Sequence, residues 1–593
     1  MKQLKFLRKI SVKIVKALLS ILPQSFVDKV KQNPRLVAAY SRNLHKSGLL
    51  YQLQTLDELK RSYADYINEH NGYLAEQITH FGETCKTDCS LIVCVTDYSA
   101  NSLLATLKSI KEQHATFSNV VIYSSANNTV KINEFLSLHS ALSFKVVTSL
   151  NTECLPPKVV NSPCFFVFAG DVLHPYLGFV LATELSSSSK LAYVDTDFLN
   201  EKSQQREFAD FKPDWNPDLQ LTNGYISSGI WVKSISDFSA AKLPLNTFML
   251  SVFMCTRYIS NPKVRVEHIS QVLLSRPSNL PKLSNAKKQL RALYAPFASI
   301  MESALPSVYL RWHLNTQPLV SIIIPTRNGL ALVKGCIESI LNKTTYSNYE
   351  ILLIDNGSDD PECLKYFNQL SKHSKIKVLN YAGEFNYSAI NNFAAKNATG
   401  EVLALVNNDI EVIEPNWLTN MVSHVMRDDI GCVGAKLLYS DNRIQHAGVV
   451  MGYGGGAGHG HKYFPSDHFG YMNRLIATQN YSAVTAACLL IKAKDFWAVG
   501  GLNAKKLTIA FNDVDLCLKV RELGKRNLYC AEAVLYHHES VSRGHEDTPE
   551  KVKRFNAELA YLQTTWADVI AADPAYNPNL TLKRENFAIK SFR

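Results

Sequence analysis

The sequence lacks the features of a secreted or membrane-spanning protein. It has no apolar run of the roughly 18 residues that a spanning helix needs. Basic residues continue through the first apolar stretch, and Pro23 follows without a small-residue cleavage site, so we do not expect a cleaved signal. None of the 12 cysteines forms a Cys-x-x-Cys pair. Scattered cysteines of this kind indicate reduced, buried thiols, and we expect a cytoplasmic protein.

Acidic residues are absent from the first 20 positions, which contain six lysines and arginines. Apolar residues interleave with these charges at roughly helical spacing, which predicts a basic amphipathic helix. Such a helix could make a peripheral contact with the inner face of the cell membrane, or it could pack on the rest of the protein. The net charge of +11 is modest for 593 residues. No recognition motif for nucleic acid accompanies it, so we expect no nucleic-acid partner.

The chain is too long for one hydrophobic core, which predicts two or three domains. Three segments of the first half recur in the same order in the second half, and they pair Ser90 with Ser321, Ser124 with Asp355 and Asp171 with Asp409. Three matches in one order favour a duplicated α/β domain over two unrelated ones. The expected organisation is a helical region at 1–85, an α/β domain at 86–276, a linker at 277–318, and a second α/β domain at 319–593 with a C-terminal helix and an ordered tail.

Acidic and amide side chains gather at three places in the second half where buried strands should end. These places are Asp355, Asn407–Asp409 and Asn512–Asp515. Strand ends are where an open α/β sheet exposes side chains to a ligand crevice. Carboxylates there suit a divalent cation that bridges phosphates, with a general base beside it. The pattern favours a nucleotide-sugar transferase. It disfavours a nucleotidyltransferase, because the first loop lacks the glycine-rich, basic sequence that would grip a triphosphate.

Several strings between residues 318 and 582 resemble one family. They include VSIIIPTRNG, FNYSAINNFA, LVNNDIEV, FNDVDLCL and DPAYNPNLTL, in this order. The second half is similar to inverting glycosyltransferases of family 2 with the GT-A fold, and in particular to bacterial two-domain enzymes, including rhamnosyltransferases, that build cell-surface polysaccharides such as O-antigen or capsule. The resemblance implies an α/β protein with two tandem GT-A (Rossmann-like) domains, the first divergent. It also implies a hexosyltransferase or deoxyhexosyltransferase that uses a UDP- or dTDP-sugar donor and a glycan or lipid-linked glycan acceptor.

The same resemblance assigns residues to the donor nucleotide. Asp355 aligns with the aspartate that hydrogen-bonds the base in the family, although a turn or helix-cap role is the alternative. The other donor-binding candidates are Pro325, Thr326, Arg327, Asn328, Asn392, Asn407 and Asn408. Turn and helix-cap roles are the alternative for the asparagines of FNYSAINN.

Metal and base assignments follow from the resemblance as well. Asp409 ends the motif where the family has Asp-x-Asp, which implies a Mg²⁺ or Mn²⁺ site, but the first position is the weaker amide ligand Asn407. In this family a histidine near the C-terminal end of the domain often coordinates the metal. We assign this role to His538, with His537 buried, although the sequence does not decide between them.

Asp513 aligns with the general base of the family. An inverting transfer needs one carboxylate that deprotonates the acceptor hydroxyl while that hydroxyl attacks the anomeric carbon. Asp515 could support this base or cap the helix. The further candidates for acceptor contact or support are His446, His459, His537 and Arg543.

The first half departs from the family pattern. Ser124 replaces the base-binding aspartate, and Asp171 lacks the first ligand of the metal motif. Asp195 and Asp197 remain as an alternative metal pair, but no base-like string follows them. We expect a scaffold or acceptor-binding domain. The alternatives are a bifunctional enzyme with two active domains and a sugar-binding scaffold in a polysaccharide assembly complex.

Overall fold

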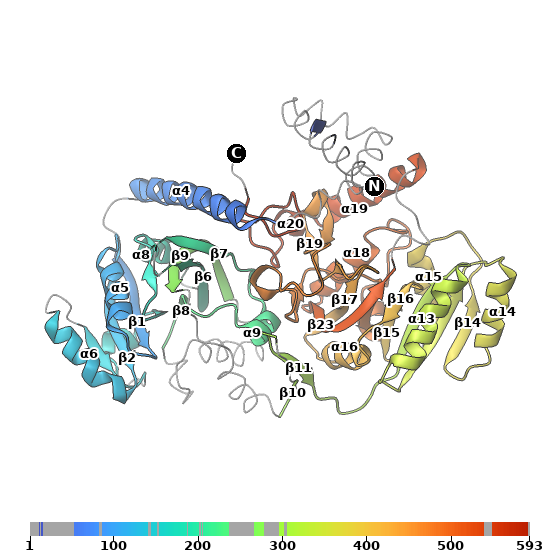
Figure 1. Ribbon diagram of the computed structural model, residues 1–593, viewed down its shortest axis with the longest axis horizontal. Coiled ribbons are helices and arrows are strands. Elements are labelled where there is room, and N and C mark those ends of the chain that lie inside the picture. The colour runs from blue at the N-terminus through green and yellow to red at the C-terminus, as the bar shows by residue number, and fades with distance from the viewer. Residues whose placement is uncertain are drawn as a thin grey trace.

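The computed structural model of the protein describes residues 53–81, 86–139, 144–150, 153–186, 188–200, 203, 205–235, 266–277, 296–301, 305–538 and 548–590, together with Ser11, Ile14 and Val15. Most of the expected amphipathic helix and much of the expected linker therefore lie outside the described residues. Figure 1 shows two α/β halves side by side, blue to green for the first and yellow to red for the second. Within the described part, no helix is both long and apolar enough to cross a bilayer.

The first half contains one sheet with helices on both of its faces. Its strands are β1 (Lys86–Val95), β2 (Thr116–Ser124), β3 (Lys145–Val147), β4 (Cys164–Phe168), β5 (Val172–Leu173), β6 (Leu191–Leu199), β7 (Arg206–Asp210), β8 (Ile230–Val232) and β9 (Val266–Pro277). Its helices are α4 (Leu56–Phe81), α5 (Ala100–Lys111), α6 (Ala126–Leu138), α7 (Pro157–Val160), α8 (Leu177–Glu184) and α9 (Pro217–Asn223). The sheet order is β3-β2-β1-β4-β8-β6-β9-β5, with β7 paired to β6.

The second half repeats this arrangement after a short hairpin of β10 (Ala298–Met301) and β11 (Tyr309–Trp312). Its main strands are β12 (Val320–Thr326), β13 (Tyr349–Asp355), β14 (Ile376–Asn380), β15 (Val402–Val406), β16 (Ile410–Val412), β17 (Ile430–Leu438), β18 (Ile444–His446), β21 (Gln479–Tyr481), β22 (Cys488–Lys492) and β23 (Arg526–His537), with a separate pair of β19 (Val449–Met451) and β20 (Ala457–His459). Its helices are α13 (Leu330–Lys343), α14 (Pro361–Leu370), α15 (Tyr387–Asn397), α16 (Trp417–Val425), α17 (Ala493–Ala498), α18 (Asn512–Glu522), α19 (Pro549–Thr565) and α20 (Ala567–Ala571).

Every strand of the first sheet has a counterpart in the second, which has one more strand, β21 paired with β23. The second sheet runs β14-β13-β12-β15-β22-β17-β23-β16, with β18 on β17 where the first has β7 on β6. Each neighbouring pair keeps its parallel or antiparallel direction in both halves. The register agrees too, because Val95 faces Ser124 as Thr326 faces Asp355. This topology supports the duplication inferred from the recurring segments.

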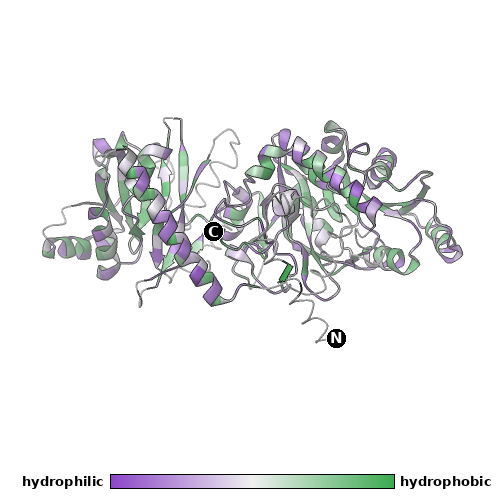
Figure 2. Ribbon diagram, turned by 90° about the horizontal axis from the view of Figure 1, so that it is seen from above, coloured by the Kyte–Doolittle hydropathy of each residue, from purple (hydrophilic) through white to green (hydrophobic). Residues whose placement is uncertain are grey.

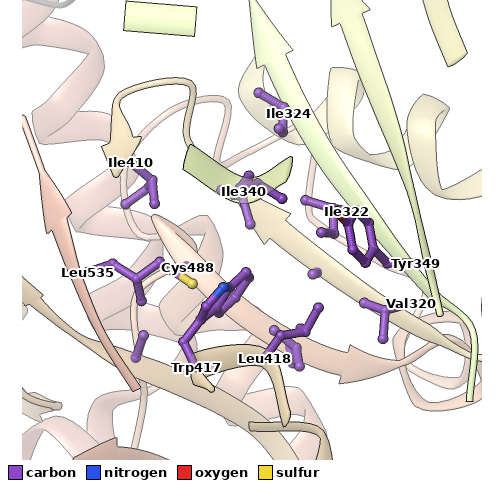
Figure 3. Close-up of a cluster of buried hydrophobic side chains, with 14 of the residues drawn as sticks. Val320, Ile322, Ile324, Ile340, Tyr349, Ile410, Trp417, Leu418, Cys488 and Leu535 are labelled. Atoms are coloured by element: carbon purple, nitrogen blue, oxygen red, sulfur yellow. The ribbon is translucent and has the colours of Figure 1, made fainter. Parts of the chain in front are cut away.

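The core of the second half has two parts, one on each face of its sheet. Strands β12, β13 and β15 are rich in Val, Ile and Leu with almost every residue buried, as expected for strands covered on both faces. Trp417 at the start of α16 is fully buried among Leu418, Cys488 and Leu535 (Figure 3). In Figure 2 the strands are largely hydrophobic, whereas the long helix α4 shows much hydrophilic surface.

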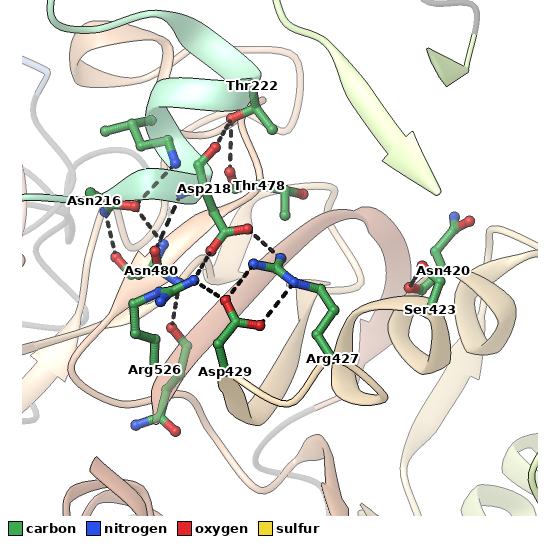
Figure 4. A network of polar contacts seen from close by, with 12 residues as sticks. Asn216, Asp218, Thr222, Asn420, Ser423, Arg427, Asp429, Thr478, Asn480 and Arg526 are labelled. Carbon is green, nitrogen blue, oxygen red and sulfur yellow. Dashed lines mark hydrogen bonds and ion pairs between the residues drawn. The ribbon is translucent and has the colours of Figure 1, made fainter. Parts of the chain in front are cut away.

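Polar contacts join the two halves along α9. Asn216 and Asn480 exchange hydrogen bonds between the Asn216 side chain and the Asn480 backbone. Asp218 is buried and forms ion pairs with Arg427 and with Arg526 (Figure 4). These contacts hold α9 of the first half against the second sheet.

The C-terminal tail, described up to residue 590, contacts both halves. Asp573 accepts hydrogen bonds from the backbone of Met451 and from Ser482 in the second half. Asn577 donates to Asp195 of the first half at 2.8 Å. The tail therefore ties the two halves together in addition to covering the second one.

Candidate active site

The first two strand ends of the second half lie side by side. Thr326 ends β12 and is in register with Asp355, which ends β13. Oδ1 of Asp355 accepts a hydrogen bond from the backbone of Ser358 at 2.9 Å, and the residue is largely buried. Pro325 precedes Thr326 on β12, and Arg327 follows it with an exposed side chain. This edge is the one at which the sequence places the donor nucleotide.

Two of the predicted donor-binding asparagines are engaged in loop contacts. Asn328 has a φ of 52°, and its side chain donates to Asp359 at 2.7 Å and accepts from the backbone of Asp359 and Asp360. The Asn392 amide exchanges hydrogen bonds with the backbone of Leu502 at 2.8 and 3.0 Å. The geometry thus favours turn and loop roles for both residues, the alternative that applies to asparagines in such positions.

The loop after β15 brings the amide cluster to the same edge. Asn408 donates to Thr326 Oγ1 at 3.0 Å, which joins this loop to the end of β12. Oδ1 of Asn407 accepts from the Tyr387 hydroxyl at 3.3 Å, and its Nδ2 lies 3.3 Å from Nε2 of His537. The loop after β15 therefore lies beside the ends of β12 and β23.

His537, and not His538, is the histidine that reaches Asp409. Nε2 of His537 lies 3.2 Å from Oδ1 of Asp409. His538 turns the other way, with Nε2 3.2 Å from Glu411 and Nδ1 2.7 Å from the Ser440 hydroxyl. The geometry differs here from the sequence-based assignment of His538, because neighbouring residues of a strand point to opposite faces.

The donor set at Asp409 fits a divalent cation. Among the described residues, Oδ1 of Asp409 is buried and forms no hydrogen bond, and Nε2 of His537 is the nitrogen that lies 3.2 Å from it. A hard cation bound by these two atoms would satisfy the carboxylate oxygen. Carboxylate oxygen and neutral imidazole are both suitable ligands. Asn407 turns its amide nitrogen toward His537 while its oxygen accepts from Tyr387, so its oxygen would reach the same site only with the amide group turned over.

Asp513 lies in the first turn of α18. Residues 486–487 connect it by hydrogen bonds to Asn407, at the same edge of the sheet as Asp409. Oδ2 of Asp513 accepts from the backbone of Ala486 at 2.9 Å, while the carbonyl of Ala487 accepts from the backbone of Asn407 at 3.0 Å. Phe511 immediately before the helix has a φ of 58°, a backbone turn that begins α18 abruptly. Asp513 is partly exposed, as a base that must reach an acceptor has to be.

Asp515 has a structural role. It is buried on the opposite side of α18, where Oδ1 accepts from the Trp566 indole at 3.0 Å and Oδ2 pairs with Lys519 at 3.1 Å. These contacts anchor α18 to the helix pair at the C-terminus. Asp515 can therefore support Asp513 only by fixing the helix.

The histidines of the glycine-rich segment are also structural. His446 is fully buried, with Nδ1 2.8 Å from the carbonyl of Ala435, and its Nε2 accepts from the backbone of Gly448 and Thr485. Burial lowers the pKa of His446 well below its usual value, so the ring is neutral. His459 has Nδ1 2.7 Å from the carbonyl of Gln445. His446 therefore shapes the floor of the site and does not face a ligand. Arg543 lies outside the described residues.

The corresponding edge of the first half is closed by its own side chains. Asp171 is buried against Arg276, whose Nε lies 3.5 Å from its Oδ1, and Ser228 donates to it. Arg276 follows Ser275, and Ser275 pairs with β5 as His537 pairs with β16. A guanidinium thus supplies the positive charge beside the aspartate.

The alternative metal pair of the first half is occupied by protein contacts. Asp195 accepts from Asn577 of the tail and lies 2.9 Å from Nε2 of His268. Asp197 accepts from the Tyr63 hydroxyl and from Arg206. The geometry does not favour the sequence-based idea that these two aspartates hold a metal.

Sequence reasoning missed the two groups that connect the base to the metal candidate. Tyr387 and the backbone of Ala486 occur in the strings FNYSAINN and TAACLLI, but nothing in their residue types announces a site role. The Tyr387 hydroxyl is within hydrogen-bond distance of both Asn407 and the Ala486 carbonyl. Only the pairing of β15 with β22 brings them together.

Comparisons with known proteins identify a family model and several relatives. Residues 321–500 match the family model of Glycosyl transferase family 2. The uncharacterized protein y4gI of Sinorhizobium fredii is 44% identical over 427 residues, which are 68% of this chain and 46% of the relative. The O-antigen biosynthesis protein RfbC of Myxococcus xanthus is 33% identical over 443 residues, which are 70% of this chain and 34% of the relative.

A third relative matches a shorter part of the chain. The UDP-Glc:alpha-D-GlcNAc-diphosphoundecaprenol beta-1,3-glucosyltransferase WfgD of Escherichia coli is 31% identical over 134 residues, which are 23% of this chain and 49% of the relative. The chain thus spans less than half the length of each of these three relatives.

Proposed function

We propose that this chain, whose residues 321–500 form a glycosyltransferase family 2 domain, transfers a sugar from a nucleoside-diphosphate donor to a growing cell-surface polysaccharide. The second half would be the GT-A catalytic domain. The similarity to an O-antigen biosynthesis protein supports the polysaccharide class of product. The name of the Escherichia coli relative, which specifies a diphosphoundecaprenol-linked acceptor, supports a lipid-linked glycan as acceptor here. Reaction with such an acceptor would take place in the cytoplasm at the inner membrane face.

One observation carries this proposal: Asp513 and Asp409 belong to the same edge of the sheet. Residues 486–487 contact Asp513 on one side and Asn407 on the other, and Asn407 in turn lies beside His537 and Asp409. A single partly exposed carboxylate next to a phosphate-binding edge suits direct displacement. Asp513 would take the proton of the acceptor hydroxyl as that oxygen attacks the anomeric carbon, and the product would have inverted configuration.

The donor would lie along the strand ends from Asp355 to Asp409. Asp355 would accept a hydrogen bond from the base of a UDP- or dTDP-sugar, and Arg327, whose side chain is exposed, would contact its phosphates. Asp409 and His537 would hold Mg²⁺ or Mn²⁺, with Asn407 as a weaker ligand. When bound, the cation neutralises the charge of the departing nucleoside diphosphate. Whether the transferred sugar is a hexose or a deoxyhexose depends on pocket contacts beyond these residues.

The two neighbouring histidines offer a matched test of the metal ligand. We expect His537→Ala to raise the Mn²⁺ concentration needed for half-maximal activity by at least about tenfold. Loss of a residue that only hydrogen-bonds a metal ligand already lowers metal affinity by about 10–100-fold, and loss of a ligand should cost no less. His538→Ala should change it little, because its contacts are with Glu411 and Ser440. Titration of activity against Mn²⁺ in both variants is the measurement. A larger shift in His538→Ala would assign the metal to the other face of the strand.

The first half would act as a scaffold or an acceptor-binding domain. Two observations support this role: the Arg276 guanidinium lies beside Asp171, and protein groups engage Asp195 and Asp197. Two active domains are the competing function. They are tested by Asp171→Asn, which removes the only carboxylate of the first half that corresponds to Asp409.

The decisive experiment is a donor screen that measures nucleoside diphosphate release from UDP-, dTDP- and GDP-sugars. Each donor is combined with a lipid-linked glycan pool and with Mg²⁺ or Mn²⁺. We expect one donor to turn over at comparable kcat in wild type and in Asp171→Asn, and product analysis to show inversion. Loss of transfer in a folded Asp171→Asn protein would make the first half a catalyst. Absence of transfer from every donor would contradict the proposed function.

A further inference from the structure

A buried cluster of three metal-binding residue types lies on the second half, away from the crevice. It consists of His424 on α16 together with Cys530 and Glu532 on β23. One nitrogen of His424, the Sγ of Cys530 and a carboxylate oxygen of Glu532 all lie within 4.8 Å of one another. His424 is 2% exposed, and Cys530 is fully buried. Residues 106 or more positions apart in the chain meet here because α16 packs on β23.

The cluster contains polar atoms that the described residues do not satisfy. Nδ1 of His424 and Oε1 of Glu532 are buried and have no hydrogen-bond partner within the described part of the chain. The other carboxylate oxygen, Oε2, accepts from the Thr478 hydroxyl and lies 3.5 Å from Cys530 Sγ. Each unsatisfied buried group costs about 1–3 kcal/mol. Two such groups beside a buried thiol indicate a missing partner.

We propose that His424, Cys530 and Glu532 bind a Zn²⁺ ion. A thiolate and a carboxylate together carry two negative charges, which a divalent cation neutralises, and a neutral imidazole completes the set without adding charge. A thiolate ligand selects Zn²⁺ over the hard ions Mg²⁺ and Mn²⁺. Zinc with ligand distances of about 2.0–2.3 Å needs ligand atoms roughly 3.5 Å apart. Small side-chain rotations from separations within 4.8 Å would close the site, with water in the fourth position.

The protonation states of the three side chains agree with this assignment. Burial lowers the pKa of His424 to about 3, so its ring is neutral and able to coordinate. Burial also raises the pKa values of the Cys530 thiol and of Glu532, which favours their protonated forms when no cation is present. Zinc would displace the thiol proton, and the carboxyl proton where one is bound, into solvent, and the Zn–S and Zn–O bonds would form in their place.

The ion would fasten α16 to β23 beneath the linker between the halves. Asn420 on α16 donates to the carbonyl of Glu532 and accepts from Arg311 on β11 at 2.8 and 3.1 Å. Strand β23 continues from Glu532 to His537, about 16 Å farther at the usual rise of a strand. The zinc site is therefore separate from the metal candidate at Asp409, and it would fix the strand that delivers His537.

The test is metal content of the full chain, purified through a tag without histidine from cells supplied with zinc. Elemental analysis should find about one zinc per chain in wild type. It should find less than a tenth of that in Cys530→Ser and His424→Ala. Cys517→Ser, which alters another buried thiol of the same half, and Asp409→Asn, which alters the crevice site, should both retain zinc.

Wild type with less than a tenth of a zinc per chain would overturn the proposal, as would full zinc content in Cys530→Ser. If the variants fail to fold, cobalt substitution of wild type decides the matter. A thiolate-to-cobalt charge-transfer band in the folded protein supports the site, and its absence overturns it. The proposal does not depend on the transferase activity.

Discussion

Asp513→Asn is expected to lower kcat by ~10²–10⁴-fold, the usual contribution of a positioned general base. The amide cannot accept the acceptor proton, but its oxygen can still accept the hydrogen bond from Ala486 that positions the side chain. The fold and the donor site should therefore survive, with little change in the KM for the donor. The measurement is steady-state release of nucleoside diphosphate from the donor that the screen identifies.

A matched variant separates loss of the base from loss of any carboxylate in this domain. Asp495→Asn removes a buried acid on α17, a different helix from the one that carries Asp513. Asp495 pairs with Lys525 at 2.6 Å. It should leave kcat within about threefold while lowering thermal stability. Unchanged kcat in Asp513→Asn would show that another group takes the acceptor proton. A rise in donor KM alone would place Asp513 in donor binding.

Asp218→Ala is expected to destabilise the protein by ~3–5 kcal/mol, which is the cost of leaving buried cations without their counter-charge. Asp218 is about 2% exposed and pairs with Arg427 and Arg526, and removing it leaves these two guanidinium groups of the second half without their partner from the first half (Figure 4). Asp429 compensates them only in part. Chemical unfolding followed by tryptophan fluorescence measures the loss.

An exposed ion pair provides the control for this prediction. Glu338→Ala breaks the pair with Lys334, in which both side chains are about half exposed, and it should cost less than about 0.5 kcal/mol. A loss below about 1 kcal/mol in Asp218→Ala would mean that the junction contributes little to stability. Because α9 carries Asp218, a large loss should be accompanied by looser association of the two halves.

The same carboxylate predicts acid sensitivity of the junction. Burial by itself would raise the pKa of Asp218, but Arg427 and Arg526 outweigh it and hold the pKa well below the ordinary value. A carboxylate with a lowered pKa in the folded state contributes stability above its unfolded pKa of about 3.9. That contribution is lost as the pH falls through this value toward the folded-state pKa, and it is already lost in Asp218→Ala.

Local patterns were sufficient for the strands and for the positions of the carboxylates. The apolar runs before Asp355 and Asp409 become β13 and β15, and the acids follow at or just after their ends. This works because hydrophobic runs and their polar ends are properties of neighbouring residues. The duplication was readable for the same reason, since Ser124 and Asp355 hold the same register in both sheets.

Side-chain direction was not readable from such patterns. His537 and His538 are equivalent in the sequence, but the antiparallel pairing of β16 with β23 places Ile410 opposite His537 and thereby sets which ring meets Asp409. A shift of one residue in that register would exchange the two rings. Likewise, the sequence predicts that the Asn392 amide binds a ligand, but in the structure this amide donates to the backbone carbonyl of Leu502.

The amino-acid sequence by itself determined the class of fold, its repetition and the acidic residues on which a transferase reaction would depend. The tertiary structure decided which of those residues remain available, because contacts between distant segments use up side chains. Asn577 reaches Asp195 across 382 positions and takes that carboxylate out of any metal site. Long-range pairing of this kind depends on how whole elements pack, and no local pattern of residues encodes it.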